Sequence, residues 1–280
     1  MKPLCIILFV LSFAQAQAQD YETYIKPLKD SVANVSVLLH HVRIGYKRGY
    51  DIDSLRQSYA SLRKELLKAK IDYIKVHPGD SVALKVFDTE VVHGINALYC
   101  PPDSLMSLFS GFNRSQQESM RGKSLHAEIV KRQNLLLNKM MPDFAFKSLD
   151  GRQYQLSSFR GKYLLLGFWF NGCKGCAESF PIIKKLNEAY GDKLQMLSVS
   201  TDQLYEGWVN GLKRYQPTWM QTWDGKGYIN GPSVESLYDV RYAPQYYLID
   251  KDGKLIYHST QSKDDDDYTV LKRMLKELLN

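Results

Sequence analysis

The stretch FWFNGCKGCAESFP, residues 168–181, decides the fold. It contains two cysteines, Cys173 and Cys176, separated by two residues. The run that leads into it, YLLLGFWF at residues 163–170, is nearly all apolar, which is typical of a central strand buried on both faces of a sheet. The run that follows, ESFPIIKKLNEAYG, is helical. The cysteines are therefore expected at the junction of a buried strand and a helix.

The residues around this junction predict an α/β domain. The run LQMLSVS, residues 194–200, predicts another strand, and the order strand, helix, strand implies a right-handed crossover between parallel strands. Two short strand-like runs flank Asp150-Gly151, a dipeptide suited to a tight hairpin turn. The domain is expected to fill residues 139–280. Its other expected elements are a helix at 205–215, strands at 246–250 and 255–259, and a closing helix from Tyr268.

Residues 20–138 have a helical pattern. In DSLRQSYASLRKELLKAKIDYI, residues 53–74, apolar side chains recur mostly three or four positions apart, which predicts an amphipathic helix. Further helices are expected at 81–98 and 124–137, and residues 115–118 fit a helix-capping box. This part is therefore interpreted as a small helical domain.

Residues 1–19 match a cleaved secretory signal. They combine a positive charge at Lys2, an apolar core from Leu4 to Phe13 and small residues near the end. The core is shorter than the roughly 20 residues that a membrane span needs, and no later stretch qualifies. The mature protein is expected to be exported to the periplasm, without a membrane span.

The composition excludes several classes of protein. The 280 residues are 44% hydrophobic, which suits a globular chain of one or two domains. Loss of Lys2 with the signal changes the formal charge from +7 to +6, and lysine and arginine are scattered, so nucleic acid is not an expected partner. Without Cys5, three of the four cysteines remain, too few for a small scaffold held by disulfides.

The spacing of Cys173 and Cys176 limits the chemistry of the pair. Haem attachment needs histidine directly after the second cysteine, but residue 177 is alanine. A structural zinc site needs four ligands, and no second close pair of cysteine or histidine lies nearby. A dithiol that opens and closes remains, with an inert structural disulfide as the alternative. The strand before the pair and the helix after it favour the redox dithiol.

The two thiols are expected to have different roles. Cys173 should begin the helix, where free N–H groups and the positive end of the helix dipole favour a thiolate, and Lys174 adds a positive charge. Cys176 should lie almost one turn further along and be more shielded. We therefore expect Cys173 to attack a partner's disulfide and Cys176 to resolve the mixed disulfide.

Three segments resemble a known family. PDFAFKSLDGRQYQLSSFRGKYLLLGFWFNGCKGC, ESFP and YDVRYAPQYYLIDKDGKLI look like the thioredoxin-like domain of the TlpA and ResA group of exported bacterial thiol-disulfide oxidoreductases. The resemblance covers residues 141–280, and the helical part is similar to the segment that precedes this domain in many Bacteroidota members. It implies a thioredoxin fold, with a central mixed sheet flanked by helices, after a small α-helical domain.

The resemblance also implies a substrate groove. Pro244 would be the cis-proline that faces the cysteines, with Ala243 as its neighbour, and Trp169 matches the family tryptophan. The backbone at Pro244 would pair with the extended chain of a bound substrate. These three residues are the expected substrate-binding residues. The alternative for Pro244 is a trans proline that starts a strand.

The motif departs from the family at four positions. Family members commonly have tryptophan before the first cysteine and proline before the second, where this chain has Gly172 and Gly175. Gly167 replaces the carboxylate of thioredoxins, and Ser179 replaces the glutamate of ResA-like proteins. With about 100° per residue, Ser179 lies close to the face of Cys176, and position 178 lies on the opposite side. Its glutamate is therefore not expected to replace the missing carboxylate.

The expected function is that of an exported thiol-disulfide oxidoreductase that reduces protein disulfides, with no metal and no dissociable cofactor. Its expected partners are disulfide-containing exported proteins and an upstream redox partner that recharges the pair. The resemblance favours reduction over net oxidation. Two alternatives from other classes are a non-catalytic peptide-binding module and a copper-handling protein that uses the same thiols.

Overall fold

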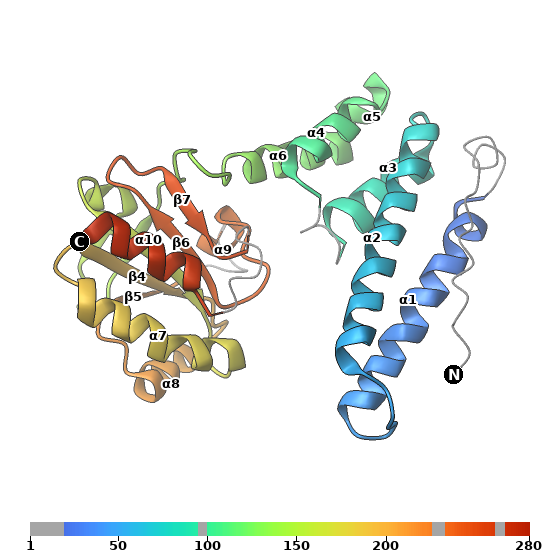
Figure 1. Ribbon diagram of the computed structural model, residues 1–280. Helices are drawn as coiled ribbons and strands as arrows, with labels where there is room; N and C mark the ends of the chain where they lie inside the picture. The colour runs from blue at the N-terminus through green and yellow to red at the C-terminus, as the bar shows by residue number, and fades with distance from the viewer. Residues whose placement is uncertain (1–19, 95–99, 226–232, 261–266) are drawn as a thin grey trace. The chain divides into compact units, whose positions relative to one another are not determined.

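A computed structural model describes residues 20–94, 100–225, 233–260 and 267–280 (Figure 1). The expected signal at residues 1–19 lies outside these described residues. Contacts divide the chain into two compact units, one up to Val130 and the other from Lys131. In the described parts, no helix is both long and apolar enough to cross a membrane.

The first unit is helical, as the sequence predicts. Its longest described helix contains the expected amphipathic segment. Asp51 is its N-cap residue, and the Asp51 carboxylate accepts hydrogen bonds from the backbone N–H groups of Asp53 and Ser54. The helices are α1 (Tyr21–Arg43), α2 (Ile52–Val76), α3 (Ser81–Val86), α4 (Pro102–Ser110), α5 (Arg114–Glu118) and α6 (Met120–Gln133), with a π-helical turn η1 (Phe87–Val92) directly after α3.

Several bounds in this unit differ from the sequence prediction, and the helix expected at 124–137 is observed as α6, Met120–Gln133. The helix expected over residues 81–98 is α-helical only to Val86 and ends as a π-helical turn at Val92, while residues 95–99 lie outside the described chain. The capping box begins at Asn113, not at Ser115: the Asn113 side chain accepts from the N–H of Gln116, and the Gln116 side chain accepts from the N–H of Asn113.

An ion pair between the buried Lys70 and the half-buried Glu90 connects the π-helical turn to the long helix. Glu90 lies 2.9 Å from the Nζ of the buried Lys70, and it accepts a hydrogen bond from the Tyr21 hydroxyl at 2.9 Å. These contacts lower the pKa of Glu90 against the opposing effect of burial. Glu90 therefore joins α1, α2 and η1 as a charged group inside an apolar bundle.

The second unit contains a five-stranded mixed sheet in the order β5-β4-β3-β6-β7 (Figure 1). Strands β3, β4 and β5 are parallel, and β6 and β7 run antiparallel to their neighbours. Nearly all side chains of β3 are buried, which confirms the predicted central strand. The bounds are β3 (Tyr163–Trp169), β4 (Leu194–Ser200), β5 (Met220–Trp223), β6 (Gln245–Ile249) and β7 (Leu255–His258).

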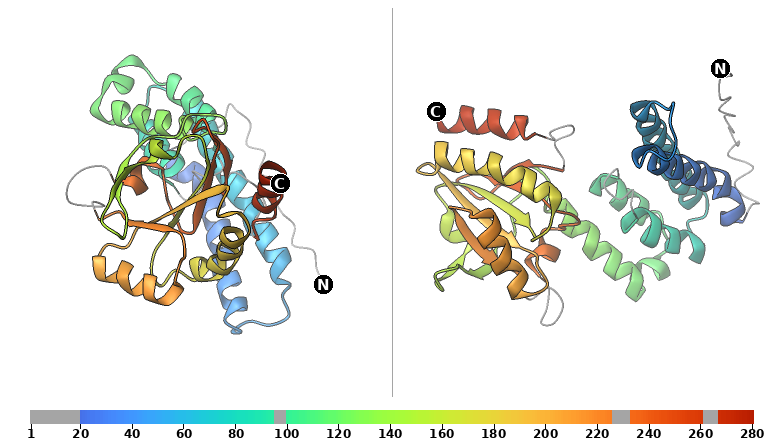
Figure 2. Two further views of the ribbon diagram at one scale, coloured as in Figure 1. Left: turned by 90° about the vertical axis from the view of Figure 1, so that its left-hand side faces the viewer. Right: turned by 90° about the horizontal axis from the view of Figure 1, so that it is seen from below.

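Helices and a hairpin cover the two faces of this sheet. Leu165 packs with α7 (Lys174–Tyr190) and α10 (Thr269–Leu279), which lie beside each other in Figure 2 as yellow and red ribbons. Its neighbours Leu164 and Leu166 face the opposite core, which includes side chains of the hairpin β1 (Ala145–Lys147) and β2 (Gln153–Gln155). Helices α8 (Tyr205–Tyr215) and α9 (Val234–Leu237) complete the unit. The predicted thioredoxin fold is confirmed.

The division between the units falls within α6, eight residues before the boundary expected from the sequence. The end of this helix belongs to the second unit because its side chains pack there. Arg132 pairs with Asp239, Nε to Oδ2 3.3 Å, and Leu135 lies in the core beneath the sheet. Residues 138–141 then bond to the outer edge of β7: the N–H of Asn138 donates to the carbonyl of Leu255 at 2.7 Å.

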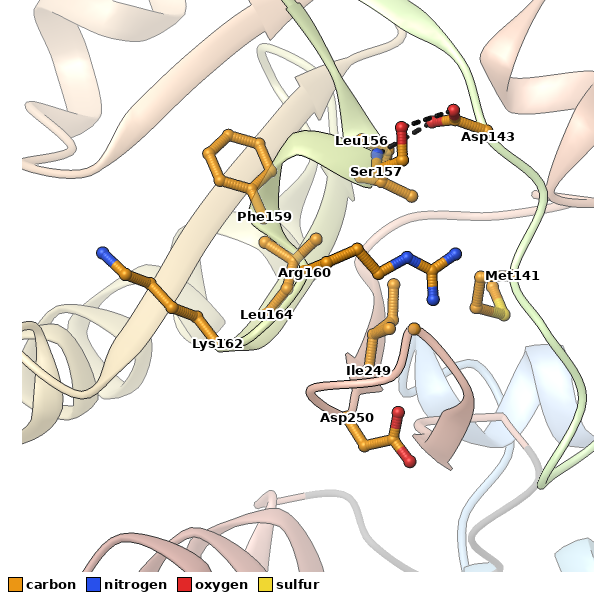
Figure 3. A pocket seen from close by; sticks show the side chains of 11 residues that line it. Met141, Asp143, Leu156, Ser157, Phe159, Arg160, Lys162, Leu164, Ile249 and Asp250 are labelled. Carbon is orange, nitrogen blue, oxygen red and sulfur yellow. Dashed lines mark hydrogen bonds between the residues drawn. The ribbon is translucent and has the colours of Figure 1, made fainter.

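A small cavity of about 20 Å³ lies near the start of β3, and Figure 3 shows the side chains that line it. Asp143 accepts hydrogen bonds from the N–H and the hydroxyl of Ser157 at its rim. The side chain of Arg160 extends over Gly253 so closely that a Cβ at position 253 would overlap the guanidinium. Since this volume suffices for about one water molecule, the feature is a packing detail, not a ligand site.

A buried histidine makes the stability of this unit depend on pH. Burial lowers the pKa of His258 to about 4, and its ring stacks on Tyr247 with centroids 4.3 Å apart. Between pH 4 and about 6.5 the unfolded chain binds a proton that the folded chain does not, so stability falls as the pH falls through this window. We expect a loss of roughly 3 kcal/mol from pH 8 to pH 4 from this residue alone.

Denaturant unfolding between pH 4 and pH 8 measures this effect. The variant His258→Gln is expected to be less stable at pH 8 but to show a flatter dependence of the unfolding free energy on pH. Parallel pH curves for the variant and the natural protein would show that His258 does not carry the dependence.

Candidate functional site

The cysteine pair lies where β3 ends and α7 begins, as the sequence predicts. Cys173 is the N-cap residue of α7, and its Sγ accepts a hydrogen bond from the backbone N–H of Cys176 at 3.1 Å. The two cysteines form a disulfide, with Cα atoms 5.2 Å apart. Because the N–H groups of a first helical turn have no partner inside the helix, the sulfur of Cys173 occupies a position suited to a thiolate.

Both cysteines are buried, and they differ slightly in the exposure of the whole residue. Cys173 is 6% exposed and Cys176 is 0% exposed. Lys174, between them, is exposed and adds a positive charge at the start of the helix. The residue with some exposure is Cys173, the one expected from the sequence to react first with a partner.

The loop before β6 lies against the first turn of α7. The peptide bond between Ala243 and Pro244 is cis, and the carbonyl oxygen of Ala243 lies 3.5 Å from the Sγ of Cys173. A Cβ atom at Gly175 would lie 3.0 Å from the Cδ of Pro244. Glycine between the cysteines therefore lets the proline loop approach the helix, and the structure brings the predicted residues Cys173, Ala243 and Pro244 together.

Asp202 holds the loop that precedes the cysteines, and the sequence interpretation missed it. Both of its carboxylate oxygens lie 3.1 Å from the backbone nitrogen of Asn171, which donates to them. The hydroxyl of Ser200 donates to the same carboxylate at 2.8 Å, and the indole N–H of Trp223 donates to the Asp202 carbonyl at 2.7 Å. The position of Asp202 in the sequence could have indicated this role. Asp202 follows β4, and the carboxyl ends of β4 and β3 lie at the same edge of the sheet.

Aromatic side chains pack beneath the dithiol. Trp169 is 1% exposed and belongs to one buried cluster with the two cysteines, Phe180 and Trp208. Its ring meets Phe180 edge to face, with centroids 5.3 Å apart. Trp169 was expected among the substrate-binding residues; in the structure it is buried in the same cluster as the two cysteines.

The residues after Cys176 have the orientations that helix geometry predicts. Ser179 is 2% exposed and lies against the sheet, where its hydroxyl contacts Tyr246 on β6. Glu178 is exposed on the outside of α7, with its carboxylate 3.8 Å from the Nζ of Lys174. The carboxylate at 178 therefore does not lie under Cys176.

Because Glu178 is exposed and Ser179 is buried, we expect substitutions at these two positions to affect the pH profile of disulfide reduction differently. Glu178→Gln is expected to change the pH profile of disulfide reduction by less than about twofold at any pH, because an exposed carboxylate in a surface ion pair has little influence. Ser179→Glu adds a titrating group on the buried face and is expected to shift the profile. Turnover measured from pH 5 to pH 9 checks both. A loss of roughly tenfold or more in Glu178→Gln would show that this carboxylate transfers protons.

Within the described residues, no group of three or more histidine, cysteine or acidic side chains is arranged to hold a metal ion. The third cysteine of the described chain, Cys100, is buried in the helical unit.

Comparisons with known proteins agree with this geometry. The Redoxin family matches residues 137–275. "Thiol-disulfide oxidoreductase ResA" of Bacillus thuringiensis subsp. konkukian is 29% identical over 128 residues, which are 45% of this chain and 71% of that protein. "Thioredoxin-like protein YneN" of Bacillus subtilis is 30% identical over 128 residues, 44% of this chain and 71% of that protein.

Solved structures include the thioredoxin domain of a thiol-disulfide oxidoreductase from Bacteroides vulgatus. It is 27% identical, covers 52% of this chain and 99% of that chain, and has a TM-score of 0.43.

A mixed sheet of this order, with a cysteine pair at the start of the helix after its central strand, defines a thioredoxin-fold thiol-disulfide oxidoreductase. The chain belongs to the TlpA/ResA-like family of these enzymes. The fold, the family and the class of reaction predicted from the sequence are confirmed.

Proposed function

We propose that this oxidoreductase reduces disulfides of exported proteins, with Cys173 as the nucleophile and Cys176 as the resolving thiol. The observation that carries the proposal is the position of Cys173: its sulfur caps α7 and accepts the N–H of Cys176, and Cys173 is the residue of the pair with some exposure. Capping by N–H groups stabilises a thiolate, which is the attacking form.

The reaction has two exchange steps. The thiolate of Cys173 attacks a substrate disulfide, so that a new S–S bond forms to one substrate sulfur and the other leaves as a thiolate. The thiolate of Cys176 then attacks the Sγ of Cys173 and releases the first substrate sulfur. The substrate gains two electrons, and the enzyme ends with the Cys173–Cys176 disulfide seen in the structure. A dithiol partner upstream must reduce that disulfide before the next cycle.

The proline loop is the proposed substrate-binding segment. Ala243 presents its carbonyl oxygen 3.5 Å from the Cys173 sulfur, and Pro244 contacts the first helical turn through the space left at Gly175. An extended substrate chain that lies along this loop would bring its own disulfide to Cys173. Trp169 would contribute by supporting the motif from below.

Export to the periplasm is part of the proposal and rests on residues 1–19, with their single Lys2 charge and apolar core. Expression of the whole chain in a Gram-negative host, fractionation and sequencing of the mature N-terminus test it. Recovery of the uncut chain from the cytoplasm would contradict export.

Reduction of insulin disulfides by the whole chain, with dithiothreitol as the upstream reductant, tests the activity. A redox titration against glutathione and dithiothreitol buffers tests the direction. A midpoint near that of thioredoxin, about −270 mV, fits a reductant, whereas a value near that of DsbA, about −120 mV, would make the protein an oxidant and overturn the proposed direction.

A further inference from the structure

Two hydroxyl groups meet on the buried side of α7, one turn after the resolving cysteine. Ser179 Oγ lies 3.0 Å from the phenolic oxygen of Tyr246 and 3.0 Å from the carbonyl oxygen of Cys176. Both side chains are buried. Their contacts link strand β6 to the backbone of Cys176 through two successive hydrogen bonds.

The direction of these hydrogen bonds follows from counting protons. The Ser179 hydroxyl has one hydrogen, and the carbonyl of Cys176 can only accept, so Ser179 donates to Cys176. Ser179 must then accept from Tyr246, whose hydroxyl donates. Burial raises the pKa of Tyr246 well above its ordinary value, so this hydroxyl keeps its proton at every pH at which the enzyme works.

The Tyr246 ring also explains the glycine in the central strand. Gly167 lies directly opposite Tyr246 in the pairing of β3 with β6. A Cβ atom at position 167 would lie 2.7 Å from the Cε1 and 2.9 Å from the Cδ1 of that ring. The ring therefore occupies the space that a side chain at 167 would need, and glycine is the residue that lets the phenol reach Ser179.

We propose that Tyr246 and Ser179 are positioning residues for Cys176, and that their hydrogen-bond chain holds the resolving thiol in place without a charged group. The inference rests on the proposed role of Cys176. Since neither hydroxyl titrates at working pH, the pair fixes the first turn of α7 equally well in acid and in weakly alkaline solution. It should act on the second exchange step and leave the attack by Cys173 unaffected.

The aromatic disulfide 5,5′-dithiobis(2-nitrobenzoate) separates these steps in the reduced whole chain. Attack by Cys173 forms a mixed disulfide and releases one thionitrobenzoate, and attack by Cys176 then closes the enzyme disulfide and releases the second. In Tyr246→Phe and in Ser179→Ala the second phase is expected to slow about fivefold, the scale of one lost hydrogen bond. The first phase is expected to change less than about twofold. Ser179→Thr, which keeps the hydroxyl, is expected to restore the second phase.

The double variant provides the sharper measurement. Because the two hydroxyls act in one chain, Tyr246→Phe with Ser179→Ala together should slow the second phase no more than either alone. The inference would be overturned if the slowing factors of the two single variants multiplied in the double variant. It would also be overturned if both phases slowed equally, or if the second phase of the variants stayed within twofold of that of the natural protein. If Ser179→Ala does not fold, Tyr246→Phe, which loses one oxygen atom, carries the same test.

The proposed function is tested in the same assay by comparing Cys176→Ser with the natural protein. If the second thionitrobenzoate is also released in Cys176→Ser, Cys176 is not the resolving thiol, and the inference fails together with that assignment. A second release that needs Cys176 but ignores both hydroxyls would reject the positioning role alone.

Discussion

Replacing Cys173 with serine is expected to abolish the reduction of insulin disulfides, with a loss of at least about three orders of magnitude, the scale seen when a covalent nucleophile is removed. The physical reason is that the first exchange step needs a thiolate at the start of α7, and Cys173 provides the sulfur that the N–H of Cys176 contacts. A serine hydroxyl remains protonated there and cannot attack a disulfide.

Cys176→Ser is expected to give a different product. The first step still proceeds, but the mixed disulfide on Cys173 has no internal thiol to resolve it, so partners stay covalently attached. Non-reducing electrophoresis followed by mass spectrometry detects them. Cys100→Ala, which removes the buried thiol of the helical unit, is the matched control and is expected to trap nothing.

Alkylation of the reduced protein gives an independent measure of these roles. Iodoacetamide is expected to label Cys173 first because this residue caps α7 and is 6% exposed, whereas Cys176 is 0% exposed. Faster labelling of Cys176, or trapping by Cys173→Ser instead of Cys176→Ser, would reverse the assignment.

Gly167→Ala is expected to produce the largest loss of stability from a single methyl group in this sheet. The added Cβ would lie 2.7 Å from a carbon of the buried Tyr246 ring, closer than such atoms approach in proteins. Either the ring or the two strands must shift. Overpacking of this kind costs about 1–3 kcal/mol, occasionally more, in the free energy of unfolding.

Chemical denaturation of the variant measures this loss, with Gly79→Ala as the control. A Cβ at position 79 would have its nearest neighbour 3.9 Å away, so a change of less than about 1 kcal/mol is expected there. Tyr246→Leu should partly rescue Gly167→Ala because the smaller side chain frees the space. Equal stabilities of the two alanine variants would show that the ring adapts at little cost.

The parts of the fold that the sequence predicts well have strong local patterns. The all-apolar run of β3, the segment of β4 and the helix at 205–215 were expected where the structure has them. Strand β5 was not predicted, since its four residues MQTW form a strand through pairing with β4. The turn into a π-helix after Val86 was likewise not predicted from the apolar pattern.

In the candidate site too, some features were predictable from the sequence and others were not. The spacing of Cys173 and Cys176 and the position of Ser179 follow from the chain itself and from helix geometry. The contact between Ser179 and Tyr246 joins residues 67 positions apart, and that of Asp202 with Asn171 joins residues 31 apart. Such contacts depend on strand order and register, which one sequence does not specify.

Residues 138–141, which follow α6 and pair with the edge of β7, affect where the redox domain can be cut from the rest of the chain. Truncation at residue 139 would discard Leu135 and Arg132, and with Asn138 a hydrogen bond to the rim of β7. An exposed sheet edge invites self-association. A fragment that starts at Lys131 keeps the segment that covers this edge. Comparing its solubility with that of the shorter fragment measures how much this segment reduces aggregation.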